Sequence, residues 1–141
     1  MTTNAIAGVG ASFKRADAAS SGTGFTAIAE VNSISGPNKS RATIDVTSLD
    51  SVGGYREFIA SFRDAGEVTL EMNWTRDGYD QINDDFESSS LWDYQIVFPD
   101  TGATTLEFSG LVTALGSAIP LDDKITMSVT IKISGQVTLT S

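Results

Sequence analysis

Two segments of the chain alternate strictly between apolar and polar residues. In residues 124–133 (KITMSVTIKI), every second side chain is isoleucine, valine or methionine, and the side chains between them are Lys, Thr or Ser. Residues 67–74 (EVTLEMNW) repeat this pattern with a period of two. Because successive side chains of a β-strand point to opposite faces of the sheet, both segments predict strands with one buried and one exposed face.

Weaker alternation predicts five further strands, and the start of the chain has no pattern. The strands are expected at residues 25–34, 41–47, 91–98, 104–115 and 136–140. The sequence SGPNKS at residues 35–40 is typical of a turn and predicts a hairpin between the first two of them. The opening residues are mostly Gly, Ala, Ser and Thr. We therefore expect residues 1–24 to form a flexible arm and residues 25–141 to form a single β-domain.

Residues 77–90 change to a helical period. Tyr79, Ile82 and Phe86 are spaced at i, i+3 and i+7, and acidic residues cover the remaining face, which predicts a short amphipathic helix. Residues 48–66 follow neither period, and a connection of this length is usually functional or bound to a partner. The expected fold class is mainly β: an antiparallel β-sandwich or partly closed barrel with one short α-helix against it.

The composition excludes most classes of enzyme. The 141 residues include no cysteine and no histidine, so the chain lacks disulfides, thiolate ligands and the usual general base. We predict a protein that is not an enzyme and that has no catalytic residues, bound metal or cofactor. The chain also begins without a signal-peptide pattern and has no run of about 20 apolar residues, so synthesis in the cytoplasm and no membrane span are expected.

The charge is unevenly distributed along the chain. The net charge is −9; residues 1–64 carry six acidic and six basic residues, whereas residues 65–123 carry twelve acidic residues and only Arg76 as a base. Such a surface repels phosphate, so tight binding of nucleic acid is not expected. A wall that repels DNA remains compatible with this distribution.

Residues 100–103, Asp-Thr-Gly-Ala, match the active-site signature of retroviral aspartic proteases. In those enzymes the motif lies early in the chain, whereas here it lies near the C-terminal end and directly follows Pro99. Alternating residues flank it on both sides at hairpin distance, and its composition is that of an ordinary turn. We interpret Asp100 as a turn residue, and an aspartic protease is a distant alternative.

Two other groups of residues suggest ligands only weakly. The acidic residues between Asp77 and Glu87 have the oxygen atoms that Ca²⁺ prefers, but their spacing does not match a calcium-binding loop, which favours a solvated or partner-facing surface. Trp74 and Trp92 flank the predicted helix and suggest a sugar-binding platform. Trp74 falls on the apolar face of its strand, however, which favours burial.

Three passages resemble the major tail tube protein of long-tailed, non-contractile bacteriophages. They are REFIASFRDAGEVTLEMNW at residues 56–74, YQIVFPD at residues 94–100 and the stretch at residues 108–139. Their order carries the resemblance, with the helix inserted where that family has one, and it covers the chain from about residue 25 onward. It implies a structural protein of the virion in which six copies join their sheets into a ring. The rings stack into a tube through which DNA passes without specific binding.

The resemblance also implies partners. They are further copies of the chain, the tape-measure protein, and the tail tip or terminator proteins. We expect residues 49–64 to contact the neighbouring subunit or ring, with three aromatic anchors, two pairing cations and an acidic residue. In that order these residues are Tyr55, Phe58, Phe62, Arg56, Arg63 and Asp64. The other interpretation is ordinary surface charge on a strand packed against the core.

Three glutamates are candidates for lining the bore of such a tube. Glu67, Glu71 and Glu107 fall on the polar faces of predicted strands, where an acidic surface would let DNA slide. The arm at residues 1–24 would become ordered only on assembly. A non-enzymatic β-sandwich module that binds carbohydrate or a host surface is the alternative function.

Overall fold

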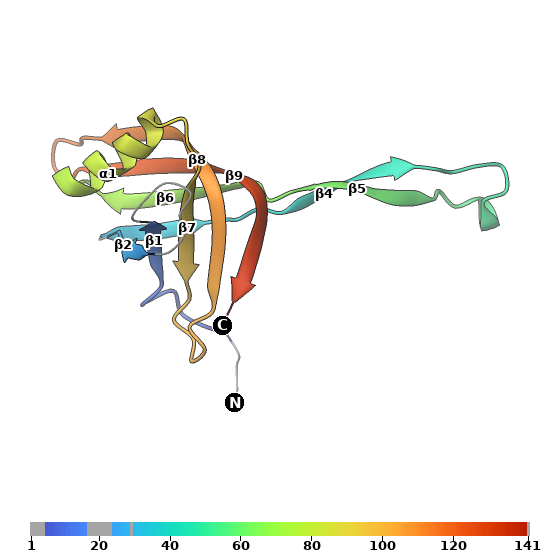
Figure 1. Cartoon of the computed structure of the whole chain (residues 1–141), viewed down its shortest axis with the longest axis horizontal. Helices are drawn as coiled ribbons and strands as arrows, with labels where there is room; N and C mark the ends of the chain where they lie inside the picture. The colour runs from blue at the N-terminus through green and yellow to red at the C-terminus, as the bar shows by residue number, and fades with distance from the viewer. Residues whose placement is uncertain (1–4, 17–23, 29, 141) are drawn as a thin grey trace.

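The segments that alternate with a period of two form the centre of an antiparallel sheet. The computed structural model describes residues 5–16, 24–28 and 30–140. Within them, seven strands form one sheet in the order β2-β1-β7-β8-β9-β6-β3, and β4 and β5 form a separate hairpin (Figure 1). The bounds are β1 Ser12–Ala16, β2 Phe25–Ala27, β3 Val31–Ser35, β4 Ser40–Asp45, β5 Phe58–Asp64, β6 Glu67–Asn73, β7 Trp92–Val97, β8 Thr105–Ala118 and β9 Thr126–Thr140, with a 3-10 turn at Val52–Gly54 and the helix α1 at Arg76–Glu87.

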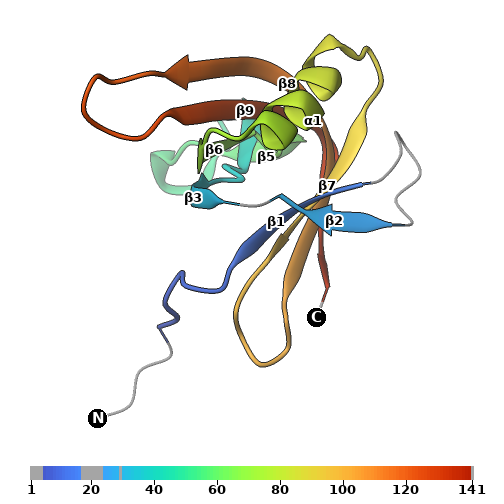
Figure 2. The ribbon, with the colours of Figure 1, turned by 90° about the vertical axis from the view of Figure 1, so that its left-hand side faces the viewer.

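The order of the strands requires the sheet to curl. β2 and β3 lie at opposite ends of the seven-stranded order, yet only residues 28–30 separate them in the chain. A link of this length spans at most about 14 Å. The edges of a flat sheet of seven strands would be about 29 Å apart. The two edges therefore approach each other, and Figure 2 shows the partly closed, strongly bent sheet that results. The predicted mainly β class, with one short helix, is confirmed.

The apolar face of the sheet and α1 enclose the core. Three apolar residues of β6 lie beside three of β9, and all six are fully or almost fully buried. They are Val68, Leu70 and Met72 of β6 and Met127, Val129 and Ile131 of β9. The Oγ1 atom of Thr75 accepts a hydrogen bond from the backbone N–H of Gly78 at 3.1 Å and caps the start of α1. The helix lies across one face of the sheet (Figure 2). The predicted helix is confirmed, although it ends three residues earlier than expected.

The hairpin of β4 and β5 projects from the body as an extension of another strand pair. β3 pairs with β6, and the chain leaves that pair along β4 and returns along β5 (Figure 1). At the junction, Gly36 and Gly66 have positive φ angles of 104° and 80°. A Cβ atom at Gly66 would lie 2.2 Å from the backbone oxygen of Asn38, and one at Gly36 would lie 2.3 Å from that of Glu67. Glycine therefore permits the two backbones to cross closely here.

Two predictions about the first part of the chain were wrong. The segment expected as one strand at residues 25–34 forms two strands, β2 and β3, which pair with β1 and β6 respectively. Consequently residues 35–40 do not close a hairpin but connect β3 to β4. Residues 25–34 contain no glycine or proline, so the sequence gives no sign that the chain crosses between the two edges of the sheet after β2.

Part of the predicted arm at residues 1–24 belongs to the sheet. Residues 12–16 form β1, which pairs with β2 and β7, and Phe13 and Ala16 are completely buried. This correction concerns residues 12–16; residues 1–4 and 17–23 of the predicted arm lie outside the described residues. At the other end of the chain, the two strands expected at residues 124–133 and 136–140 are one strand, β9, which bends as it continues (Figure 2).

Candidate functional site

The projecting hairpin, residues 40–64, exposes large apolar side chains. Phe62 is 90% exposed and Tyr55 is 78% exposed, and about half of the surface of Phe58 is also accessible. Every residue of β4 is exposed, and β5 is nearly as open. The alternative that β5 packs against the core is therefore wrong. Soluble proteins rarely expose apolar surface in this concentration without a binding role.

Asp64 differs from the other residues predicted for this surface. Its carboxylate accepts a hydrogen bond from the backbone N–H of Gly66 at 2.8 Å and lies 3.3 Å from the Nζ atom of Lys132. These contacts, the first above all, lower the pKa of Asp64 below its ordinary value. Asp64 therefore helps to fix the base of the hairpin to β9. Arg56 and Arg63 are exposed and have no carboxylate partner within ion-pair distance among the residues that the structure describes.

The open edges of the seven-stranded sheet include β3 and the C-terminal part of β8. β3 pairs with β6 on one side and with no described strand on the other. β8 pairs with β9 along most of its length, but β7 covers its other side only over residues 105–110. Residues 111–118 of β8 therefore offer unpaired backbone groups to a neighbour. Open edges of this kind are templates for pairing with another chain.

The face of the sheet that points away from the core is hydrophilic. Glu67 and Glu71 are exposed on it, opposite Lys132 and Ser128 of β9. Glu107 lies on the same side of the bent sheet, in register with Gln95 and with a threonine of β9, and is half-buried. The three glutamates thus share the polar side of the sheet, opposite the apolar side that packs under α1.

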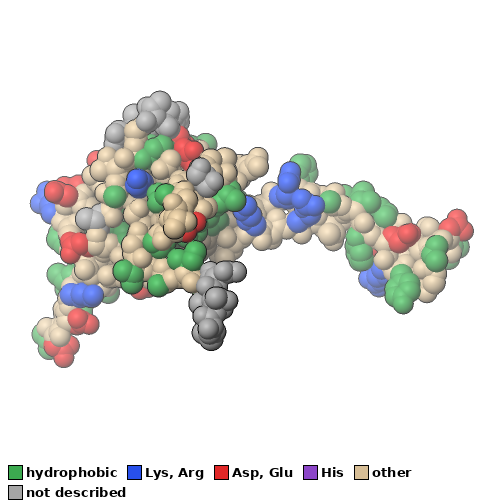
Figure 3. Space-filling model, turned by 90° about the horizontal axis from the view of Figure 1, so that it is seen from below, with side chains coloured by type: hydrophobic (Ala, Val, Ile, Leu, Met, Phe, Trp, Pro, Cys, Tyr) green, Lys and Arg blue, Asp and Glu red, His purple; other side chains and the backbone are tan. Residues whose placement is uncertain are grey.

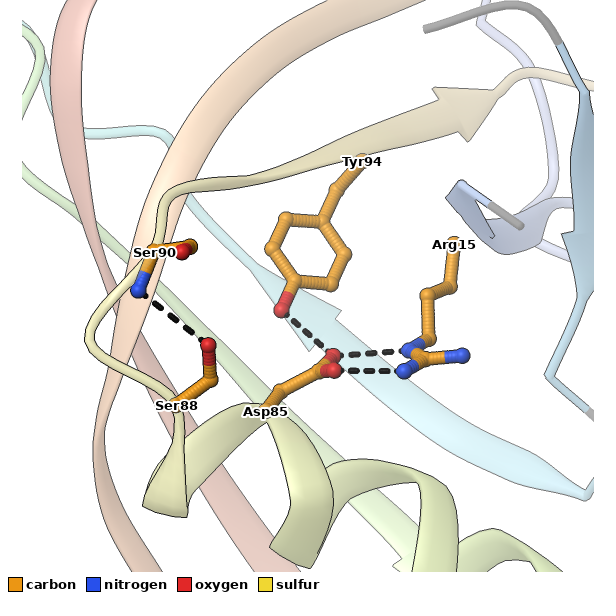
Figure 4. Close-up of polar contacts among 5 residues, drawn as sticks. All are labelled: Arg15, Asp85, Ser88, Ser90 and Tyr94. Atoms are coloured by element: carbon orange, nitrogen blue, oxygen red, sulfur yellow. Dashed lines mark hydrogen bonds and ion pairs between the residues drawn. The ribbon is translucent and has the colours of Figure 1, made fainter. Parts of the chain in front are cut away.

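A buried cluster of charged and polar side chains joins β1, α1 and β7 (Figure 4). The carboxylate of Asp85, which is 1% exposed, accepts hydrogen bonds from the Nε and Nη2 atoms of Arg15 at 2.8 and 2.6 Å. The Tyr94 hydroxyl donates to the same carboxylate at 2.8 Å. The Arg15 guanidinium also lies 4.2 Å from the centre of the Trp92 ring. The cluster fastens the first strand of the sheet to the helix.

The electrostatics of this cluster follow from its contacts. The hydrogen bonds to Asp85 raise the pKa of Arg15, which keeps the guanidinium charged. Burial, reinforced by the Asp85 carboxylate, raises the pKa of the Tyr94 hydroxyl well above its usual range. The hydroxyl is therefore a permanent donor. The acidic helix was predicted to present Asp85 to solvent or a partner, and this is wrong because Asp85 lies three residues after Ile82 on the buried face.

The other candidate sites have structural explanations. The Oδ1 and Oδ2 atoms of Asp100 accept hydrogen bonds from the backbone N–H and the hydroxyl of Thr104, which lower the Asp100 pKa. Asp100 therefore shapes the turn between β7 and β8, as predicted. Arg15 covers the Trp92 ring, so Trp92 does not form an open platform with Trp74.

Among the described residues, no group of three or more acidic side chains lies close enough together to hold a metal ion. No helix in this part of the chain is long and apolar enough to span a membrane.

Solved structures similar to this chain include proteins of tails and of injection systems. The chain is 21% identical to a protein of the tail of an empty gene transfer agent particle with C6 symmetry; the match covers 92% of this chain and 96% of that one, with a TM-score of 0.74. A chain of the sheath/tube terminator of an extracellular contractile injection system is 18% identical over 100% of both chains, with a TM-score of 0.72. A third, from the SPP1 tail tube, is 7% identical, covers 92% of this chain and 75% of that one, and has a TM-score of 0.66.

The fold is therefore that of the tube proteins of phage tails and related particles. The family model described as Lambda phage tail tube protein, TTP, matches residues 8–140. The chain belongs to the Lambda phage tail tube protein family, and it is a structural protein of the virion tail. No curated protein matches the chain as a relative.

Proposed function

We propose that copies of this chain join edge to edge into a ring and that the rings stack into the tail tube. The observation that carries the proposal is the pair of open edges, at β3 and at residues 111–118 of β8. Pairing between these edges satisfies the backbone groups of both and removes these two exposed edges from the assembly. In this role the chain acts through architecture and carries no catalytic site.

The strand directions are compatible with this junction. Four strands lead from one open edge to the other, and each pairs antiparallel with the next. In order they are β8, β9, β6 and β3. Because this set has an even number of strands, β3 of one copy runs opposite to β8 of the next when the copies are related by rotation about the ring axis. The joint is therefore antiparallel, like the ladders within each copy. The C6 symmetry of the similar gene transfer agent tail supports six copies in each ring.

The polar face of the joined sheets lines the bore. The apolar face lies under α1, so the helix occupies the outside of the ring and the face with Glu67 and Glu71 points inward. Acidic side chains repel phosphate, and DNA therefore passes along the wall without specific binding. Glu107 lies on the same side of the sheet, on the other part of the bent β8.

The projecting hairpin contacts a neighbouring ring. Tyr55, Phe58 and Phe62 supply apolar anchors, and Arg56 and Arg63 supply cations, whereas Asp64 fixes the hairpin base. The N-terminal segment is expected to order further on assembly. The tape-measure protein and the tail tip or terminator proteins are the partners proposed for the tube; tubes, terminators and baseplates occur among the similar structures.

Hydrogen exchange combined with microscopy tests this proposal. Negative-stain images of the purified protein should show rings or tubes. Backbone amides of β3 and of residues 111–118 should exchange quickly in the monomer and become protected in the tubes, whereas the amides of β6 should be protected in both. Tubes in which both edges still exchange quickly would contradict the edge-to-edge joint. Dispersed monomers that bind sugars would favour the carbohydrate-binding alternative.

A further inference from the structure

Two arginines face each other at the base of the projecting hairpin without a counter-charge. Arg41 of β4 and Arg63 of β5 are directly opposite partners in the hairpin register, and Lys39 precedes them. Like charges in this position destabilise a strand pair. No carboxylate lies within ion-pair distance of these three cations among the described residues, because Asp64 is engaged by Gly66 and Lys132. These three cations therefore lack an anionic partner of their own among the described residues.

A cleft beside these cations provides room for such an anion. It has a volume of about 700 Å³, and its walls include the three cations, one acidic residue and apolar side chains. These residues are Lys39, Arg41 and Arg63, then Asp64, and then Phe62 and Val137. We refer to it as the basic cleft. One wall is the C-terminal part of β9, where residues 134–140 have no partner strand on the side away from β8 among the described residues. Cations beside apolar surface suit a segment with acidic and apolar side chains.

The far end of the same hairpin carries such a segment. The hairpin end, residues 46–57, and the adjoining Asp45 include three acidic residues and only one basic residue. Its large apolar side chains are exposed to solvent, three of them almost completely. The acidic residues are Asp45, Asp50 and Glu57, and the exposed apolar residues include Leu49, Val52 and Tyr55. Viewed from below, basic side chains gather where the hairpin leaves the body and acidic side chains gather toward its far end (Figure 3).

We propose that the hairpin end of one copy binds in the basic cleft of a copy in the next ring. This inference rests on the proposed tube function and specifies which surfaces meet between rings. The hairpin continues the direction of β3 and β6, so it leaves its own ring along the strands (Figure 1). The six residues of β4 alone carry the chain about 20 Å outward. Because the two surfaces differ and lie on one chain, the contact is head to tail and repeats without limit.

Charge reversal on each surface tests the contact. The cleft variant carries Arg41→Glu and Arg63→Glu, and the end variant carries Asp50→Lys and Glu57→Lys. Each should raise the protein concentration needed for tube formation by about tenfold or more, because like charges then meet between rings. The variant with all four changes should form tubes near the concentration of the unchanged protein. Arg76→Glu, on the exposed surface of α1, is the matched control and should leave tube formation unchanged. Circular dichroism should show the same folded body in every variant.

The outcomes separate the inference from the proposed function. If the unchanged protein forms no rings or tubes, the proposed function fails. If it forms tubes and the cleft variant does so equally well, the proposed function stands and the docking contact is wrong. Failure of the fourfold variant to recover assembly, while both reversed surfaces remain folded, also overturns the pairing. A cleft variant that assembles normally but loses binding of a short DNA duplex would instead identify a phosphate site.

Discussion

Replacing Asp85 with alanine should release β1 from α1 and destabilise the folded monomer strongly. The Asp85 carboxylate is buried and accepts two hydrogen bonds from Arg15 and one from Tyr94. Removal of one partner of a buried ion pair costs about 3–5 kcal/mol, because the other charge stays buried without compensation. The Arg15 side chain is 15% exposed, so water reaches part of it. We therefore expect the lower end of this range, about 3 kcal/mol.

Urea unfolding of the monomer, followed by circular dichroism, measures this loss. For a slope of about 1.5 kcal/mol per molar urea, the midpoint should fall by about 2 M. Arg15→Met alone and together with Asp85→Ala completes a double-mutant cycle, in which the two losses should be far from additive. Asp80→Ala, which breaks the exposed pair with Arg76, is the control and should cost less than about 0.5 kcal/mol. A loss below about 1 kcal/mol for Asp85→Ala would refute the assigned role of the cluster.

Three further predictions concern other parts of the chain. Gly66→Ala should destabilise the hairpin junction by about 1–3 kcal/mol, seen as faster hydrogen exchange in β4 and β5, because of its positive φ and the 2.2 Å approach of a Cβ atom to a backbone oxygen. Asp100 should titrate below its ordinary pKa of 3.8 in an NMR titration, owing to the donors of Thr104. Because the pKa of Asp100 is lower in the folded protein than in the unfolded chain, Asp100 stabilises the fold at pH values above its unfolded pKa. This stabilisation is lost as the pH falls through the folded pKa. A measured pKa above 3.8 would contradict the prediction. Tubes carrying Glu67→Lys and Glu71→Lys should retain labelled short DNA in sedimentation at low salt, whereas unchanged tubes should not; equal retention would place these residues outside the bore.

The sequence predicted strands well where the two faces of a strand have different environments. β6 and β9 alternate because one face packs under α1 and the other meets solvent. β1 was missed because it has only five residues, and its Arg15 is directed toward a buried carboxylate rather than toward solvent. A pattern that classifies charge as exposed cannot identify such a strand. The pairing order depends on contacts between distant segments, which alternation within one segment does not encode.

The candidate site was predictable in composition but not in shape. The aromatic and charged residues between Tyr55 and Arg63 indicated a contact surface, yet the same pattern was compatible with a strand packed on the core. Only the register of β4 and β5 reveals that both faces of the hairpin are exposed and that Arg41 and Arg63 are opposite each other. Asp85 is the reverse case. Its spacing of three residues from Ile82 fits the buried face of the helix, but its charge led to the wrong prediction that it is exposed.

In the assembly that we propose, the open edges and the projecting hairpin make different contributions. An edge-to-edge joint uses backbone hydrogen bonds, which are common to all strands and carry little information about the partner. The hairpin adds apolar anchors and charges, which do select a partner and an orientation. A chain with open edges alone would pair with unrelated strands, and a chain with the hairpin alone would lack a continuous wall. The tube that we propose therefore requires both, and the glycines at the junction permit the hairpin to continue from β3 and β6, because the backbones cross there without room for side chains.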